Sequence, residues 1–316
     1  MVYDVFNGDA DGICALHQLR LAHPCNSVLI TGVKRDVQLL QRVHSVRGDQ
    51  VTVLDISLDS NFSALKQQLA NGALVSYFDH HTADKIFLHS ALTFYWDDAV
   101  DVCTSILVSR FLQDKYEIWA NVAAFGDGLM KTGYLMAARA GLSNGQTQQL
   151  LELGTLLNYN AYGEQIEDVN VAPAELYQDL HQYKDPFDFI ASSSNISLLR
   201  TSYAADMAML DDIRPICEQS QAVIYILPCQ PWARRISGLL ANKLKDQSSN
   251  KSFAVLTQKT DGCYVVSVRA ADPKNKPASG FCNLFPSGGG RQAAAGINSL
   301  PAEELAQFSK KFFAYF

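Results

Sequence analysis

The chain has 316 residues, 48% of them hydrophobic and 18% charged, which is enough apolar material for a sizeable core and excludes a disordered chain. No apolar stretch of about 18 residues without charges is present, so we expect no membrane span. The amino-terminal MVYDVFNGDADG does not read as a secretory signal, and length divided by about 150 predicts two domains.

The formal net charge of −6 argues against a general nucleic-acid coat protein, but it hides an asymmetry along the chain. Residues 231–316 hold 12 Lys and Arg against 5 Asp and Glu, a balance of +7, and residues 1–230 have a balance of −13. An acidic front half and a basic back half suggest metal ions on one lobe and an anionic ligand on the other. Chance variation in solvated surface charge is the alternative explanation.

Seven cysteines, an odd number, are scattered along the chain without any CxxC pair. This pattern predicts reduced core thiols of a cytoplasmic protein, and neither a zinc site nor a disulfide framework. The residues concerned are Cys14, Cys25, Cys103, Cys217, Cys229, Cys263 and Cys282.

Short apolar runs alternate with helical patterns through the first 130 residues, which predicts a parallel α/β sheet whose ligands bind at the carboxyl ends of the strands. Residues 100–180 follow with a largely helical pattern. The predicted strands are Val2–Phe6, Ser27–Thr31, Val51–Leu54 and Leu74–Phe78, and the predicted helices are Ile13–Ala22, Val37–Val43 and Asn61–Gln68.

A mixed helix and connector pattern, roughly residues 186–221, precedes a second and smaller α/β unit. We therefore expect an α/β protein with a first domain over 1–190, a helical connector over 191–220 and a second domain over 221–316. In the second domain we expect strands at Ala222–Leu227, Phe253–Thr257 and Cys263–Ala270, helices at Ile236–Leu244 and Ala302–Phe313, and a Gly-rich loop over Gly280–Asn298.

Asn7-Gly8-Asp9-Ala10-Asp11-Gly12 lies directly between the first strand and the first helix. Two carboxylates two residues apart on this turn can face one shared cleft, and hard divalent cations prefer such oxygen ligands. The alternative is that the aspartates only cap the helix and complement its dipole.

Three further acidic positions occur in the same lobe. Asp55 ends an apolar strand, Asp79-His80-His81 ends the next one, and Asp127 lies between two glycines. Each is weak by itself, but five aspartates and adjacent histidines at one edge would form a two-metal site with oxygen and nitrogen ligands. This ligand set favours manganese over calcium, with magnesium as the alternative.

The segments FNGDADG, LDIS, FDHH and AFGDG, in this order, resemble the four motifs of the DHH phosphoesterase superfamily. The later FPSGGGRQAAAG resembles the glycine-rich signature of its partner domain, DHHA1, which usually reads Gly-Gly-Gly-His. The resemblance extends from Val2 to about Phe313. It implies a DHH domain over 1–190 and a substrate-binding DHHA1 domain over 221–316.

The resemblance also implies roles for individual residues. Two Mn²⁺ or Mg²⁺ ions would share the bridging carboxylate of Asp55. Asp9 would hold the first ion, with Asp79 close by as a metal-site and catalytic residue. His81 would act as the second catalytic residue by facing the phosphate. The second ion would be held by Asp11, His80 and Asp127.

Two positions depart from the family pattern. Asn7 stands where members carry His or Asp, and its neutral amide is a weaker ligand, so the first metal site would be labile or completed by water or substrate. The alternative is that Asn7 only caps the following turn. Arg291 stands in place of the usual His, beside a Gly288-Gly289-Gly290 backbone that could form an anion nest, and its guanidinium suits phosphate.

Other candidates for substrate contact lie in the basic half. Arg269 matches a substrate-contacting arginine of the family, and Arg234 and Arg235 are further candidates for phosphate, with a solvated helix start as the alternative. Stacking on nucleotide bases would need exposed aromatic rings. The second lobe offers Trp232, Tyr264, Phe281 and Phe285 for this purpose.

The leading interpretation is a cytoplasmic, metal-dependent phosphoesterase. It would cleave phosphodiester bonds of short oligonucleotides or dinucleotides with a two-metal-activated water, as an exonuclease or nanoRNase, with the substrate clamped between the two lobes. A polyphosphatase is the alternative within the enzyme class. A non-catalytic anion-binding protein is the alternative outside it, supported by Asn7 and Arg291. Some members of the family dimerise through the first lobe, so a homodimer is the matching expectation.

Overall fold

The computed structural model describes residues 1–316, and its contacts divide the chain into two compact units, Met1–Tyr203 and Ala204–Phe316. The division falls within helix α9 (Ser194–Ala208), inside the stretch expected to be a connector. With this boundary the second unit has 13 Lys and Arg against 9 Asp and Glu, a balance of +4. The charge asymmetry of the sequence therefore keeps its sign but is smaller than the split at residue 230 indicates.

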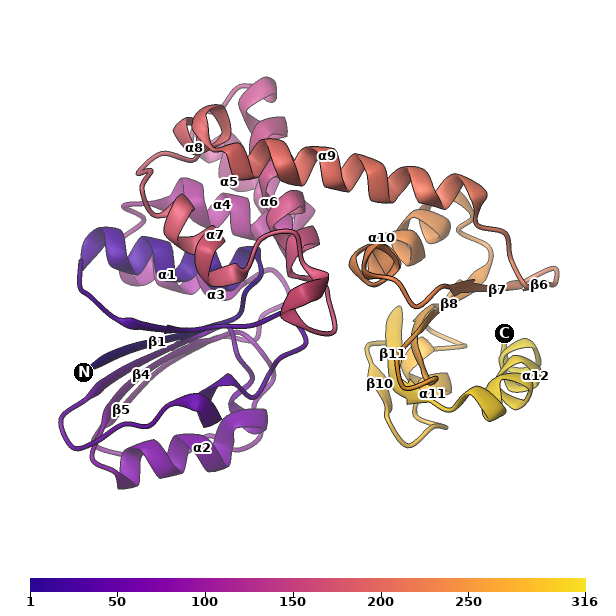
Figure 1. The fold of residues 1–316 in the computed structure, drawn as a ribbon, viewed down its shortest axis with the longest axis horizontal. Coiled ribbons are helices and arrows are strands. Elements are labelled where there is room, and N and C mark those ends of the chain that lie inside the picture. Colours follow the sequence, from indigo (N-terminus) through magenta and orange to yellow (C-terminus); the bar gives the residue numbers. More distant parts are fainter. The chain divides into compact units, whose positions relative to one another are not determined.

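The first unit contains a five-stranded parallel sheet in the order β2-β1-β3-β4-β5 (Figure 1). Four of its strands are the predicted ones. The fifth was missed because no helix separates it from β4, so it falls outside the strand–helix alternation on which the prediction was based. The strands are β1 (Val2–Phe6), β2 (Val28–Ile30), β3 (Gln50–Leu54), β4 (Leu74–Asp79) and β5 (Leu92–Trp96).

Alternate side chains of these strands face two different cores, as the two-residue period of a strand requires. Phe6, Leu54 and Phe78 face the larger core, beneath helices that include α1 (Ala10–Ala22), α3 (Thr104–Phe111), α4 (Glu117–Gly126) and α6 (Asn144–Ala161). Val53 and Tyr77 face the smaller core on the other side of the sheet, which α2 (Leu58–Ala70) covers (Figure 1). The sheet is thus buried on both faces, as parallel sheets are.

The helical elements of this unit lie mostly between residues 104 and 203, as the sequence predicts. They are α1 (Ala10–Ala22), the 3₁₀ turn η1 (Leu39–Arg42), α2 (Leu58–Ala70), α3 (Thr104–Phe111), α4 (Glu117–Gly126), α5 (Met130–Arg139), α6 (Asn144–Ala161), η2 (Ile166–Asp168), α7 (Pro173–Leu180) and α8 (Pro186–Ser192), followed by α9.

The helix predicted over Val37–Val43 is only the 3₁₀ turn η1, and a buried asparagine explains the difference. The side chain of Asn61 donates to the carbonyl of Val37 at 2.6 Å and accepts the amide of Leu40 at 3.2 Å. These two bonds pair the carbonyl of Val37 and the amide of Leu40, which a longer helix would pair within itself. The segment before η1 therefore does not need to be helical to satisfy these two backbone groups.

The second unit contains a mixed six-stranded sheet in the order β10-β11-β9-β8-β7-β6, in which only β7 and β8 are parallel. Helix α10 connects the two parallel strands. The elements are the turn η3 (Met209–Asp212), β6 (Cys217–Glu218), β7 (Ala222–Leu227), α10 (Pro231–Gln247), β8 (Ser252–Gln258), β9 (Tyr264–Arg269), α11 (Ala278–Cys282), β10 (Gly288–Gly290), β11 (Ala294–Leu300), η4 (Ala302–Glu304) and α12 (Leu305–Tyr315).

The Gly-rich loop predicted over Gly280–Asn298 is wrong, because this stretch forms α11 and the antiparallel pair β10–β11. A Cβ on Gly288 would lie 1.8 Å from the carbonyl oxygen of Cys282, and Gly290 adopts a φ of +136°. Close backbone packing and a left-handed conformation therefore explain these glycines without a ligand.

The core of the second unit is a cluster of phenylalanines around α11 and α12. The ring of Phe281 lies 5.5 Å from those of both Phe285 and Phe308, and 5.4 Å from that of Phe312. Phe281 and Phe285 are buried, so the prediction that they stack on bases is wrong. Sequence alone could not separate a core aromatic from an exposed one.

Two of the exclusions made from the sequence can be compared with the structure. All seven cysteines are free thiols, but the expectation that they are core residues is wrong for Cys25 and Cys217, which are exposed. Not one of the helices combines the length and the apolar character that crossing a membrane requires.

A pair of histidines is packed inside the first unit. Nδ1 of His17, on α1, lies 3.0 Å from Nδ1 of His181, and the ring of His17 packs edge-on against Trp119 at 4.5 Å. Burial, together with the proximity of His181, lowers the pKa of His17 to about 3. The folded protein therefore keeps the His17 imidazole neutral under conditions in which an exposed histidine is protonated.

This arrangement predicts a loss of stability in acid. The pKa of an unfolded histidine is about 6.5, so below that value the unfolded chain binds a proton that the folded chain excludes until about pH 3. We expect His17 to reduce the free energy of unfolding by about 2 kcal/mol between pH 7 and pH 5. Urea unfolding of wild type and His17→Gln at both pH values measures this, and the variant should lose less stability.

The exposed His44 provides the control, since His44→Gln should follow the wild-type pH dependence. Parallel pH profiles for wild type and His17→Gln would contradict the assignment.

Candidate metal and active site

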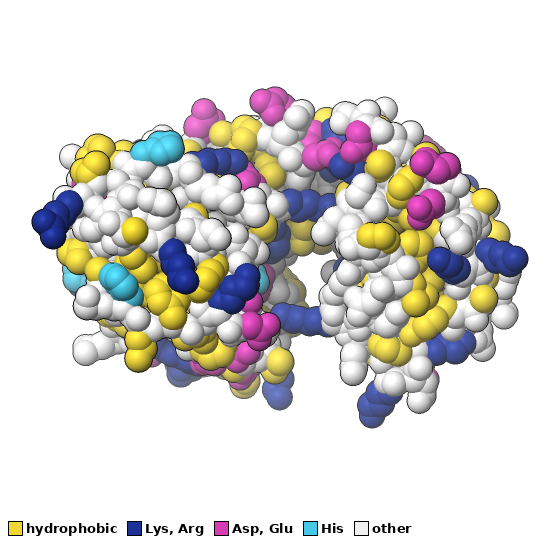
Figure 2. Space-filling model, turned by 90° about the horizontal axis from the view of Figure 1, so that it is seen from below, with side chains coloured by type: hydrophobic (Ala, Val, Ile, Leu, Met, Phe, Trp, Pro, Cys, Tyr) yellow, Lys and Arg dark blue, Asp and Glu magenta, His cyan; other side chains and the backbone are white.

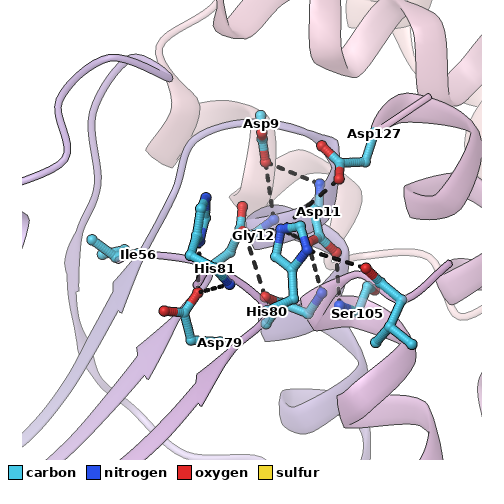
Figure 3. Close-up of polar contacts among 12 residues, drawn as sticks. Asp9, Asp11, Gly12, Ile56, Asp79, His80, His81, Ser105 and Asp127 are labelled. Atoms are coloured by element: carbon cyan, nitrogen blue, oxygen red, sulfur yellow. Dashed lines mark hydrogen bonds and ion pairs between the residues drawn. The ribbon is translucent and has the colours of Figure 1, made fainter. Parts of the chain in front are cut away.

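The predicted acidic residues lie together at the carboxyl ends of β1, β3 and β4 (Figure 3). These three strands are neighbours in the sheet, in the order β1-β3-β4, although their ends are 25 to 73 residues apart in the sequence. The side chains that follow them therefore meet at one edge. Asp127, at the carboxyl end of α4, joins them from the helical layer.

Asp9 caps α1 and also belongs to the cluster. Its Oδ1 accepts the backbone amides of Asp11 at 3.0 Å and Gly12 at 3.1 Å. A Cβ on Gly12 would lie 2.1 Å from the carbonyl oxygen of Asn7, so only glycine allows the helix to start this close to the strand. The capping explanation is thus correct for Asp9, and it is compatible with a place in the site.

Asp11 is held by the amino terminus of α3. Its two oxygens accept the backbone amides of Thr104 at 2.8 Å and Ser105 at 2.7 Å. Burial raises the pKa of this carboxyl group, and the nearby charges of Asp127 and Asp9 add to the effect. The helix terminus stabilises the carboxylate but does not neutralise it.

Asp55 ends β3 in a left-handed backbone conformation with a φ of +58°, which is uncommon for a residue with a side chain. Its Oδ1 lies 3.4 Å from Nε2 of His80 and accepts the hydroxyl of Thr104 at 3.4 Å. Burial raises the pKa of Asp55 well above its ordinary value, and repulsion from Asp11 and Asp9 raises it further.

His80 presents one particular nitrogen to the carboxylates. Nδ1 lies 3.1 Å from the carbonyl oxygen of Val102, which can only accept, so Nδ1 carries a proton and Nε2 faces the cluster. Nε2 is 3.8 Å from Asp11 and 3.9 Å from Asp127. Burial alone would lower the pKa of His80, but the bond to Asp55 and the surrounding carboxylates raise it to about 10.

Two overlapping groups of side chains could hold a metal ion. In one, ligand atoms of Asp11, His80 and Asp127 lie within 4.8 Å of one another, and in the other Asp55, His80 and His81 do so. Carboxylate oxygens with an imidazole nitrogen suit manganese or magnesium. The residues fit such an ion, because a cation would relieve the repulsion that raises the pKa values of Asp11 and Asp55.

The amide oxygen of Asn7 is buried and accepts no hydrogen bond. Asn7 therefore does not cap the turn with this atom, and the helix cap is Asp9 instead. A buried acceptor without a partner is costly, so this oxygen is available to a water molecule or a cation.

Asp79 is a member of neither group, but it contacts and orients His81, which belongs to the second one. It is fully buried, its Oδ1 is 2.7 Å from Nδ1 of His81, and its Oδ2 accepts the amide of Leu58 at 3.2 Å. The place of Asp79 among the metal ligands stays a prediction, and the contacts that the structure gives its carboxylate are to His81 and Leu58. His81 keeps 43% of its side chain exposed, so its other nitrogen can reach a ligand in solvent (Figure 3).

Sequence reasoning missed one member of the site, Lys34. Nζ of Lys34 lies 2.5 Å from Oδ2 of Asp9, 3.5 Å from Oδ1 of Asp127 and 3.1 Å from the amide oxygen of Asn158. Burial alone would lower the pKa of Lys34, but Asp9 raises it well above its ordinary value. Lys34 follows β2, the neighbour of β1, so the rule that ligands meet at strand ends could have found it.

The arginines proposed for phosphate binding lie in the second unit, and several already have protein partners. Arg235 pairs with Asp206, with its Nε 2.7 Å from Oδ2. Arg269 donates to the side chain of Asn242 at 2.8 Å, and Arg234 lies 3.6 Å from the sulfur of Cys229. Arg291 is exposed.

The glycines beside Arg291 do not form the expected anion nest. The amide of Gly288 donates to the carbonyl of Phe285 at 3.0 Å, and that of Arg291 donates to Ala294 at 2.9 Å. On the face shown in Figure 2, the Lys and Arg side chains of the second unit, on the right, stand apart and do not form one continuous basic patch. Phosphate binding in this unit would thus depend on individual side chains.

No protein-family model and no curated protein sequence matches the chain. Solved structures do. An exonuclease RecJ bound to manganese matches with a TM-score of 0.65 and 16% identity, over 99% of this chain and 89% of that one. RecJ from Thermus thermophilus, in complex with Mn²⁺, matches with a TM-score of 0.66 and 17% identity, over 99% of this chain and 51% of that one.

A pGpG-specific phosphodiesterase, PggH from Vibrio cholerae, matches over 99% of this chain and the whole of that one, with a TM-score of 0.58 and 12% identity. These likenesses are too distant in sequence to transfer an activity, but they agree on the architecture. The chain therefore has a RecJ-like α/β fold, which agrees with the fold that the order of its motifs predicts.

Proposed function

We propose that the protein is a metal-dependent phosphoesterase that hydrolyses phosphodiester bonds of short oligonucleotides or dinucleotides. The observation that carries the proposal is the arrangement around His80, whose Nε2 faces Asp11, Asp55 and Asp127 within 3.9 Å while Nδ1 is bound to Val102. RecJ is an exonuclease and PggH a phosphodiesterase, which supports this reaction class.

Asp11, His80 and Asp127 would hold a divalent cation, with manganese as the first expectation. When bound, such a cation supplies a water molecule that ionises near neutral pH and a positive charge for the phosphate oxygens. The backbone amides of Thr104 and Ser105 keep Asp11 in place. The Val102 carbonyl keeps the proton of His80 on Nδ1, which leaves Nε2 as the ligand atom.

His81 is the residue of this site best placed to touch the substrate. Asp79 accepts a hydrogen bond from Nδ1 of His81, so Nε2 is the nitrogen left to face the substrate, and the doubly protonated imidazolium would donate its Nε2 proton to the leaving oxygen. The carbonyl of His81 also accepts the indole N–H of Trp96 at 2.7 Å. These contacts fix the direction of an imidazole that is otherwise exposed.

The second unit is proposed to act as the substrate-binding DHHA1 domain, with Arg291 as its main phosphate contact because it is exposed. Arg234, Arg235 and Arg269 contribute less directly, since each already contacts a protein group. Of the four aromatic residues considered for base stacking, Trp232 and Tyr264 remain, because both are only half-buried.

A polyphosphatase is the second candidate. The burial of Phe281 and Phe285 reduces the number of rings available to bases, which favours a substrate recognised through phosphate alone. Arg291 serves such a chain of phosphates equally well.

A panel of substrates with Mn²⁺ tests the choice: the dinucleotide pApA, longer RNA, a cyclic dinucleotide, a 3′,5′-bisphosphate and polyphosphate. We expect nucleoside monophosphates from pApA, and none from Asp127→Ala. Orthophosphate released from polyphosphate alone would favour the polyphosphatase. No turnover on any substrate, with anion binding retained, would make the protein a binding module.

His81 and Arg291 should affect different kinetic parameters. His81→Ala should reduce kcat by about 100-fold or more, as loss of a proton donor does. Arg291→Ala should mainly raise KM, because a phosphate contact made equally in the ground and transition states contributes to binding alone. Steady-state kinetics on the best substrate measures both, and equal losses in both parameters for both variants would contradict this division.

Metal binding can be measured without turnover. Since an ion that binds only the folded chain stabilises it, Mn²⁺ at about 100 times its Kd should add about 2.7 kcal/mol to the free energy of unfolding. We expect Asp127→Asn to lose most of this gain, and Asp98→Asn, at an exposed acid, to keep it. A Mn²⁺ effect on thermal unfolding that is the same in all three proteins would contradict the ligand assignment.

A further inference from the structure

Lys34 brings a positive charge of the chain itself into the carboxylate cluster. Its backbone amide donates to the carbonyl of Ala161 at 2.8 Å, which fixes the segment after β2 against the end of α6. The side chain is three-quarters buried, and its Nζ is also 5.7 Å from the centre of the Tyr162 ring. The fold thus fixes the position of the Lys34 amine, in contrast to the amine of an exposed surface lysine.

The ammonium group of Lys34 is fully satisfied by acceptors of the site. It has three N–H groups, and three oxygens lie within reach: those of Asp9 at 2.5 Å, Asn158 at 3.1 Å and Asp127 at 3.5 Å. Two of the three are carboxylates that the sequence predicts to be metal ligands. The position that Lys34 occupies therefore has the ligand chemistry of a cation site.

Asp9 is already neutralised by this arrangement. One of its oxygens accepts two backbone amides at the start of α1, and the other contacts Lys34. The neighbouring Asn7 contributes an oxygen without charge. A dication beside Asp9 would gain little from these groups and would be repelled by the ammonium of Lys34.

The two possible metal groups also compete for one atom. Both include His80, whose Nδ1 is bound to the Val102 carbonyl, so Nε2 is the nitrogen that either group must use. Without His80, the group with Asp55 keeps only His81 as a second ligand. The group of Asp11, His80 and Asp127 keeps two carboxylates and the nitrogen, so it is the better site.

We propose that the ammonium of Lys34 takes the place of one of the two metal ions that the motifs predict, and that the chain holds a single tightly bound divalent cation between Asp11, His80 and Asp127. The inference deepens the proposed function and rests on it for the identity of the reaction. Lys34 then provides a fixed positive charge next to the metal, where phosphate oxygens would lie.

Manganese stoichiometry tests the proposal independently of turnover. Isothermal titration of the metal-free protein with MnCl₂ should give one tight Mn²⁺ per chain, and electron paramagnetic resonance should give the spectrum of an isolated ion. Lys34→Met removes the charge and keeps the apolar stem, so it should bind a second Mn²⁺ and show the magnetic coupling of two ions about 3.5–4 Å apart.

Two controls accompany this variant. Lys34→Arg keeps the charge and should remain at one Mn²⁺, and Lys184→Met, at an exposed lysine of the same unit, should behave as wild type. Two tightly bound, coupled ions in the wild-type protein would overturn the proposal, and this result does not depend on whether Lys34→Met folds. A folded Lys34→Met that still binds a single ion would overturn it as well.

These outcomes are distinct from a failure of the proposed function. One Mn²⁺ per chain without hydrolysis of any substrate supports the role of Lys34 as a resident cation and contradicts the phosphoesterase. Two bound Mn²⁺ ions together with hydrolysis would contradict only the role of Lys34 and would leave the phosphoesterase proposal standing.

Discussion

The burial of several carboxylates at one edge of the parallel sheet is the constraint on which the rest of the first unit depends. Asp9, Asp11 and Asp55 are each at most 2% exposed, and removing ionised groups from water is expensive unless opposite charges or hydrogen bonds replace the lost hydration. The raised pKa values of Asp11 and Asp55 express this cost directly.

The surrounding elements compensate for this cost in different ways. The amino terminus of α1 is bonded to Asp9, that of α3 to Asp11, and the ammonium of Lys34 to Asp9 and Asp127. Asp55 has the weakest support, with a single hydroxyl and an imidazole nitrogen at 3.4 Å each. The positive charge still required is therefore concentrated around Nε2 of His80, which Asp11, Asp55 and Asp127 surround, and this is where a metal ion would be most stabilising.

The second unit shows how the same residue types can follow from packing alone. Gly288 approaches the backbone of α11, and Phe285 packs in the core, although both occur in the segment that resembles a ligand-binding signature. A glycine or an aromatic residue in a motif is thus evidence for a site only when its environment is open. Arg291, which is exposed, meets that condition.

The sequence by itself determined the α/β class, four of the five parallel strands and the set of acidic residues, because strand periodicity and strand-end aspartates are local signals. It left open whether Asp9 caps a helix or belongs to a site, and it placed Asp79 among the metal ligands. Only the tertiary structure decided that the carboxylate of Asp79 is hydrogen-bonded to His81, because such a contact depends on which atoms face each other.

Lys34 illustrates the remaining limit. Nothing in the segment around it distinguishes it from a surface lysine, and its partners Asp9, Asp127 and Asn158 are spread over about 150 residues of the chain. The amine of Lys34 enters the cluster because β2 pairs with β1 and the segment after β2 is hydrogen-bonded to the end of α6. The sequence determined which groups carry charge in this protein, and the tertiary structure decided which of them neutralise one another, because that depends on distances of a few ångströms between remote segments.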